Sequence, residues 1–187
     1  MALTALDATS ALIVIDLQKG VVGFPTLVPA PEIIGRAAGL AREFRARKLP
    51  VVLVNAVGQP RPTGRTTVGM GKPQPPEWSE LVPELDVQPD DILITKHQWG
   101  AFHGTALDLY LRRLGVTQLV FAGIATSLGV ESTARAAFEH DYNLTFATDA
   151  MTDFSPDAQE NSLKRIFPML GELGTCEEIV ALLGSGS

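Results

Sequence analysis

Five short apolar runs are spaced along the chain. They cover residues 11–15, 51–54, 92–95, 118–122 and 143–147. None of these runs alternates strictly between apolar and polar positions, a pattern typical of strands that are buried on both faces, as in a parallel sheet. A sixth, shorter strand is predicted near residues 175 and 176.

Between the runs, apolar residues recur at the spacing of amphipathic helices. Four such stripes fall within residues 33–44, 107–114, 130–138 and 163–170, and a last helix is expected at 177–183. Strands that alternate with helices predict right-handed βαβ units. The fold class is therefore α/β, a three-layer doubly wound (Rossmann-like) sheet of about six mainly parallel strands with helices on both faces.

Composition agrees with one compact domain. The chain has 187 residues, of which 45% are hydrophobic, and we assign residues 1–184 to a single domain and 185–187 to a flexible tail. A net charge of −6 argues against a protein that coats nucleic acid. No run is apolar enough to span a bilayer and no cationic leader opens the chain, so we expect a cytoplasmic protein with no membrane partner.

One long connection interrupts the pattern. Residues 58–89 contain seven of the thirteen prolines, and a connection this long is often functional. One interpretation is an ordered surface loop with a short helix near residues 78–85. The other is a lid or an oligomer contact over the strand ends.

Chemistry-bearing residues follow the predicted strands. Asp16 comes after the first strand, Lys96 after the third, and a segment from Gly123 to Val130 leads from the fourth into a helix. Ligands of doubly wound sheets bind at the carboxyl ends of the strands, and a helix N-terminus offers N–H groups to an anion or oxyanion. A plain Asp–Lys ion pair is the alternative interpretation.

Four strings carry a family resemblance, and they lie at residues 12–18, 95–102, 123–134 and 149–155. With these strings in this order, the chain resembles the isochorismatase-like hydrolase superfamily. The resemblance implies a small-molecule substrate and a homo-oligomer, a dimer or a tetramer. It also implies an Asp, a Lys and a nucleophilic Cys. Asp16 and Lys96 match the first two, whereas Gly129 occupies the cysteine position and cannot be a nucleophile.

The vinyl-ether hydrolases of this superfamily, the isochorismatases, also resemble this chain in having glycine at that position. The resemblance thus implies that Asp16 protonates the substrate as a general acid, that Lys96 positions Asp16 and the substrate, and that Gly129 leaves room for substrate or water. Burial would favour protonated Asp16 and a nearby Lys96 would oppose it. Two alternatives stay open, a catalytically silent ligand binder or oligomeric scaffold, and an amide hydrolase that uses water with Asp16 as the base.

The resemblance extends to substrate contacts, although with departures. The expected substrate-binding residues are Gln18, Trp99, Ile124 and Ala125. Arg65, in the long connection, is a further candidate because arginine suits pairing with a substrate carboxylate, and a solvated loop arginine is the alternative. Val57 stands where the vinyl-ether hydrolases have a glutamine, and Ala125 stands where they have an aromatic residue. A cis peptide bond is predicted between Ile124 and Ala125.

No metal or other cofactor is expected. The three histidines lack zinc-ligand spacing, and residues 55–58 do not match the Asp-x-His string of the metal-binding branch. The hydroxyls of Thr126 and Ser127 are expected to satisfy free N–H groups ahead of the helix. The single cysteine, Cys176, lies far from the predicted strand ends and is expected to be a small buried hydrophobe without a catalytic role.

Overall fold

The structure is a computed structural model that describes residues 2–57 and 74–183. Six parallel strands form one sheet in the order β3-β2-β1-β4-β5-β6. The strands are β1 (Ser10–Ile15), β2 (Val51–Ala56), β3 (Ile92–Lys96), β4 (Gln118–Ile124), β5 (Asn143–Thr152) and β6 (Glu172–Gly174). The predicted fold class is confirmed, whereas the predicted tail and Arg65 lie outside the described residues.

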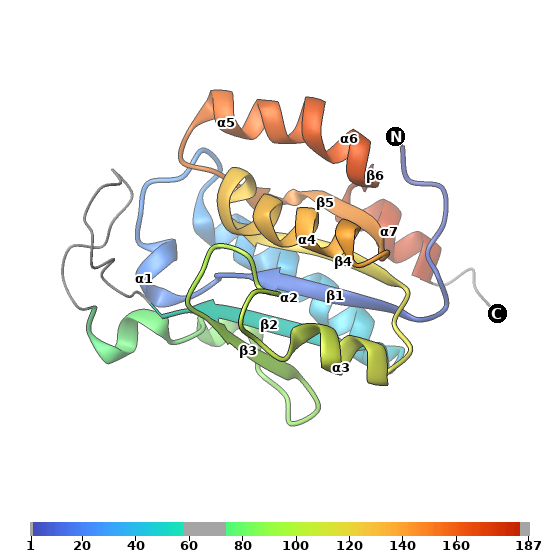
Figure 1. Cartoon of the computed structure of the whole chain (residues 1–187). Helices are drawn as coiled ribbons and strands as arrows, with labels where there is room; N and C mark the ends of the chain where they lie inside the picture. The colour runs from blue at the N-terminus through green and yellow to red at the C-terminus, as the bar shows by residue number, and fades with distance from the viewer. Residues whose placement is uncertain (1, 58–73, 184–187) are drawn as a thin grey trace.

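Helices cover both faces of this sheet (Figure 1). They are α1 (Lys19–Val22), α2 (Ala30–Ala46), α3 (Leu107–Arg113), α4 (Glu131–Glu139), α5 (Pro156–Asn161), α6 (Phe167–Leu170) and α7 (Cys176–Leu183). One apolar core lies between the sheet and α2 with α7, and a second lies between the sheet and α3, α4 and α6. No described helix is long and apolar enough to cross a membrane.

Burial along the strands follows their place in the sheet. Every residue of the central strands β1 and β4 is buried, as their uninterrupted apolar sequences predict. β3 is an exception to the expectation that most strands are buried on both faces, because Leu93 is 57% exposed. This strand is at the edge of the sheet, so its outward-facing residues lack the cover that the central strands receive.

The helix ends mostly match their sequence signals. Gly115 follows α3 with a φ of +67°, and the Ser155 side chain accepts the Ala158 N–H at the start of α5. The sixth strand lies slightly earlier than predicted. Its three residues pair with Thr145–Ala147, and the chain enters α7 at Cys176, where the Asp149 carboxylate accepts the first N–H of the helix.

Residues 74–89 form two short 3-10 turns, η1 (Pro76–Ser79) and η2 (Pro83–Leu85), where one short helix was predicted. A proline starts each turn and the chain between them is extended, since the residue before a proline disfavours helix. Trp78 packs against Gly20 of α1, and Leu81 forms a bridge with Gln18. This segment therefore lies beside the carboxyl end of β1.

The sheet changes winding direction between β1 and β4, and these strands approach closely at their carboxyl ends. Ile15 is paired with Gly123, whose φ is +126°. A Cβ atom at Gly123 would lie only 2.1 Å from the Ile15 carbonyl oxygen, so this spacing depends on glycine. The close approach brings Asp16 beside the segment that follows β4.

Candidate active site

Asp16 directly follows β1 and turns the chain away from the sheet. Its φ of 53° is in the left-handed region, which aspartate tolerates better than most residues. Its N–H donates to the Val54 carbonyl oxygen at 2.9 Å, which keeps the backbone tied to β2. The carboxyl group is thereby directed to the carboxyl end of the sheet, with only 12% of the side chain exposed.

Lys96 is the last residue of β3 and reaches across β2 to Asp16. Its Nζ lies 2.8 Å from Asp16 Oδ2 and donates to the Trp99 carbonyl oxygen at 2.6 Å. The lysine side chain is 1% exposed. A single buried ammonium group therefore holds both the carboxylate and the turn that carries Trp99.

Burial has a larger effect on the pKa of Asp16 than the opposing charge of Lys96. Burial raises the pKa of Asp16 from 3.8 to about 6, against the opposing effect of the Lys96 charge and hydrogen bond. The second carboxyl oxygen, Oδ1, is buried and has no hydrogen-bond partner among the described residues. Asp16 therefore has one carboxyl oxygen that is not engaged by the described residues, and a pKa suited to proton transfer near neutral pH.

Gly129 lies against this pair. It belongs to η3 (Thr126–Val130), a π-helical turn ahead of α4. A Cβ atom built on Gly129 would lie 3.0 Å from Asp16 Oδ2 and 3.1 Å from Lys96 Nζ. A side chain at position 129 would thus contact the Asp16 carboxyl group and the Lys96 ammonium group, and glycine has no side chain to do so.

The segment between β4 and η3 contains the predicted cis peptide bond, which is confirmed between Ile124 and Ala125. The expectation for the two hydroxyls is wrong for Thr126, because its hydroxyl is buried without a hydrogen-bond partner. The Ser127 N–H is instead bound by the Asp153 carboxylate at 2.6 Å. This helix start is therefore partly occupied and is not a fully free anion site.

Asp153 is a residue that the sequence reasoning did not single out. It follows β5 at the same edge of the sheet and is 2% exposed. The pattern that identified Asp16, an acidic residue directly after an apolar run, does not find Asp153, because β5 extends to Thr152, beyond the apolar run that ends at residue 147.

Gln18 was expected to bind substrate, and the structure gives its amide other partners. Its Nε2 donates to the carbonyl oxygens of Ala56 and Trp78, each at 3.0 Å. Its Oε1 accepts the Ala56 N–H at 2.6 Å. The side chain is fully buried, so the geometry favours a structural role that joins β1, β2 and η1.

Replacing Gln18 with alanine is expected to destabilise the fold by about 2–4 kcal/mol, because several buried backbone groups lose their partner. Chemical denaturation measures this change in the free energy of unfolding. Gln88→Ala is the matched control, since the Gln88 side chain donates one exposed bond, to Asp86. Equal stability of the two variants would contradict the structural role of Gln18.

The other expected substrate contacts are placed as follows. Ile124 and Ala125 are buried at the end of β4, and Trp99 is 47% exposed in the turn after Lys96. Arg65 lies outside the described residues. Their contacts with substrate stay predictions, as do the two interpretations of the long connection.

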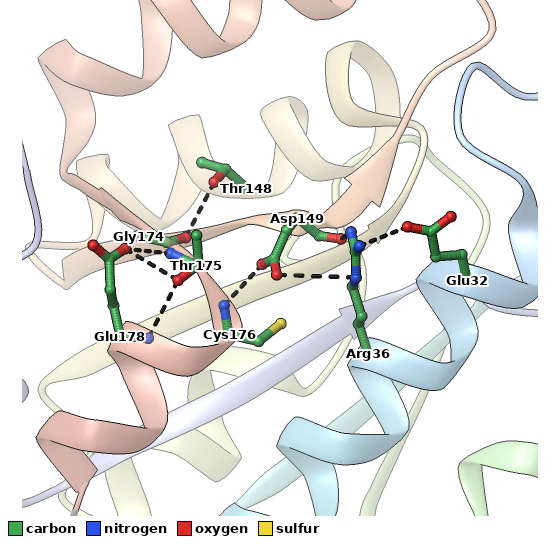
Figure 2. A network of polar contacts seen from close by, with 8 residues as sticks. All are labelled: Glu32, Arg36, Thr148, Asp149, Gly174, Thr175, Cys176 and Glu178. Atoms are coloured by element: carbon green, nitrogen blue, oxygen red, sulfur yellow. Dashed lines mark hydrogen bonds and ion pairs between the residues drawn. The ribbon is translucent and has the colours of Figure 1, made fainter.

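Cys176 lies in a polar network at the start of α7 (Figure 2). Its N–H donates to Asp149 Oδ1 at 2.8 Å, and Arg36 donates to the Asp149 carbonyl oxygen at 2.6 Å. Figure 2 shows the Asp149 carboxylate between the Cys176 backbone and Arg36. Burial and the Asp149 carboxylate raise the pKa of the Cys176 thiol to about 12. A thiol with this pKa is not an activated nucleophile.

No group of three or more His, Cys, Asp or Glu side chains in residues 2–57 and 74–183 could hold a metal ion. Within those ranges, the polar groups brought together at the carboxyl end of β1 are Asp16 and Lys96. Their arrangement, an acid with a raised pKa beside a buried cation and against Gly129, suits proton transfer to or from a bound substrate.

Comparisons with known proteins show the family to which the chain belongs. Residues 10–178 match the family model of the Isochorismatase domain. The chain is 42% identical over 178 residues to the uncharacterized isochorismatase family protein YwoC of Bacillus subtilis (strain 168), covering 91% of this chain and 92% of the relative. It is 31% identical over 205 residues to the ureidoacrylate amidohydrolase RutB of Pantoea ananatis (strain LMG 20103), covering 94% of this chain and 82% of the relative.

A solved structure is also similar. An isochorismatase family protein from Burkholderia thailandensis superposes with a TM-score of 0.86 and 46% sequence identity, over 96% of this chain and 97% of that chain.

Proposed function

Because this chain belongs to the isochorismatase family of hydrolases, we propose that it hydrolyses the vinyl ether of a small, carboxylated cyclic substrate. In this proposal Asp16 is the general acid, and neither a cysteine nucleophile nor a metal takes part. The reaction class is that of an isochorismatase.

The observation that carries the proposal is the position of Gly129. A residue at this position contacts both Asp16 and Lys96, and glycine offers no atom for covalent attack. An amidase route through a thioester therefore has no nucleophile here, and Cys176 does not supply one. Vinyl-ether hydrolysis needs only a proton donor and water.

The steps follow from the chemistry of an enol ether. The carboxyl proton of Asp16 is transferred to the terminal methylene carbon, which becomes a methyl group and leaves an oxocarbenium-like cation. Water adds to the cationic carbon and gives a hemiketal. One proton of the added water returns to Asp16. The hemiketal C–O bond to the ring then breaks as the hemiketal hydroxyl proton passes to the ring oxygen, which releases pyruvate and a ring alcohol.

Lys96 stabilises the negative charge that develops on Asp16 as its proton leaves. Its ammonium group stabilises the Asp16 carboxylate that remains after proton transfer, at 2.8 Å. Burial disfavours that carboxylate before the transfer. The pair thus keeps Asp16 protonated often enough to act and still able to release its proton.

Pyruvate release from isochorismate and related enol ethers tests this proposal directly. We expect the wild-type protein to release one pyruvate for each ether bond cleaved. Absence of pyruvate release from every enol ether tried, with the protein folded, would contradict the proposed reaction.

A second candidate is amide hydrolysis in which Asp16 acts as a base on water. The likeness to an amidohydrolase favours it. The two candidates require opposite protonation states of Asp16, so they predict opposite pH dependences.

The proposal extends to assembly and location. We propose a cytoplasmic homo-oligomer, a dimer or a tetramer. Exposed apolar side chains at the sheet edge and on the adjoining α3 support a partner surface, with Leu93 57% and Leu109 57% exposed.

A further inference from the structure

Asp153 is a buried carboxylate that is satisfied by backbone N–H groups. Oδ2 accepts the Ser127 N–H at 2.6 Å. Oδ1 accepts the N–H groups of Phe154 at 2.7 Å and Ser155 at 3.2 Å. No cationic side chain of residues 2–57 and 74–183 forms an ion pair with it. Three such bonds stabilise a buried charge, so this carboxylate has a defined structural task.

Asp153 joins segments that are distant in the sequence. Its carbonyl oxygen accepts the Leu27 N–H at 3.0 Å, and the neighbouring Phe154 ring packs on Phe24 with a 6.1 Å centroid distance. Its carboxylate binds Ser127, the second residue of η3. The chain after β1, the chain after β4 and the chain after β5 therefore meet at one residue.

The hydrogen bond from the Ser127 N–H to Asp153 lies close to Asp16 and Lys96. Ser127 is two residues before Gly129, and η3 closes on Ala125, whose carbonyl oxygen accepts the N–H groups of Leu128 and Val130 at 3.1 and 3.2 Å. Fixing Ser127 therefore fixes the turn that places Gly129 against Asp16 Oδ2. No other carboxylate is bonded to this turn in the part of the chain that the structure describes.

We propose that Asp153 is a positioning residue that fixes the start of η3, holds Gly129 over the Asp16–Lys96 pair and thereby keeps water from the Asp16 carboxyl group. This role rests on the proposed function in one respect, that Asp16 is the residue that carries out the chemical step. Asp153 itself does not touch the substrate.

The proposed role of Asp153 predicts a measurable change in the pKa of Asp16. The charged group that faces Asp16 from β3 is Lys96, and η3 carries no acidic or basic side chain. Displacement of η3 therefore changes how much water reaches Asp16, and it moves no charged side chain of η3. Water reaching Asp16 lowers its pKa toward the ordinary value of about 4.

Two substitutions of Asp153 distinguish the effect of the carboxylate position from the effect of its charge. Asp153→Asn removes the charge and places an amide N–H against a backbone donor. Asp153→Glu keeps the charge and moves the carboxylate by one methylene group. Asp149→Asn is the matched control, because Asp149 also follows the apolar part of β5 and binds a helix N–H, that of Cys176, but at α7 (Figure 2).

The experiment titrates the Asp16 carboxyl group by carbon-13 NMR in the full chain and, in parallel, measures kcat/KM for pyruvate release. We expect both Asp153 variants to lower the Asp16 midpoint, and kcat/KM to fall by about 10²-fold, mainly through kcat, since misplacement by about 1 Å costs that much. Asp149→Asn should leave the midpoint and kcat/KM unchanged.

An unchanged Asp16 midpoint in folded Asp153→Asn and Asp153→Glu would overturn the positioning role, and so would an equal effect of Asp149→Asn. The titration needs no substrate. A wild-type protein without pyruvate release but with the expected midpoint shifts would therefore reject the proposed function and support the role of Asp153.

Discussion

Asp16→Asn is expected to lower kcat/KM for enol-ether hydrolysis by about 10³-fold, within the range typical of lost general acid catalysis. Asparagine has the shape of aspartate but no carboxyl proton to transfer to carbon. The side chain keeps its size beside Lys96 and Gly129, so substrate binding should change less than kcat. Initial rates of pyruvate release over a range of substrate concentrations measure both quantities.

Asp91→Asn is the matched control for this loss. Asp91 is also a buried, paired carboxylate, 2.7 Å from Arg45 Nη2 with 2% of its side chain exposed. It precedes β3, at the opposite end of the strand from Lys96. We expect this variant to lose stability and to keep kcat/KM. If Asp16→Asn retained as much activity as Asp91→Asn, Asp16 would not be the acid.

Gly123→Ala is expected to destabilise the fold by about 4 kcal/mol or more, the range of severe backbone conflicts. The added Cβ would lie 2.1 Å from the Ile15 carbonyl oxygen and 2.7 Å from the Ile15 nitrogen. Both atoms are backbone of β1 and are held by the sheet ladder, so neither can move alone. The glycine φ of +126° adds strain for any side chain.

Gly35→Ala is the control for this substitution. Gly35 lies within α2, and a Cβ there meets nothing within 4 Å. Alanine should stabilise the helix by about 0.5–1 kcal/mol. Urea denaturation of both variants measures the contrast. If Gly123→Ala were as stable as the wild-type protein, the close approach of β1 and β4 would not depend on this glycine.

The sequence predicts the fold well because the signals are local. Apolar runs that do not alternate predict parallel strands. The carboxyl ends of parallel strands meet at one edge of the sheet, so the places of Asp16 and Lys96 at the ends of their strands predict that both lie at that edge. The edge position of β3 is a property of strand order, which no local pattern carries. The apolar sequence of β3 therefore does not predict that Leu93 is exposed.

The contacts of Gln18 and Asp153 that the sequence does not predict join distant segments. Gln18 binds backbone groups of β2 and η1, and Asp153 binds a backbone N–H of η3. Neither partner has a side-chain signature, so a sequence motif cannot show the contact. The pKa of Asp16 was left open for the same reason, since it depends on how completely the folded chain excludes water.

The pH dependence of kcat/KM for pyruvate release by the wild-type protein is the sharpest test of Asp16 as the acid, because it reports the ionisation of the free enzyme. Asp16 has a pKa raised to about 6, and a general acid works in its protonated form. We therefore expect a constant kcat/KM at lower pH and a tenfold fall for each pH unit above about pH 6. A kcat/KM that rises as the pH increases through about 6 would show that Asp16 acts as a base, and would contradict general acid catalysis by this residue.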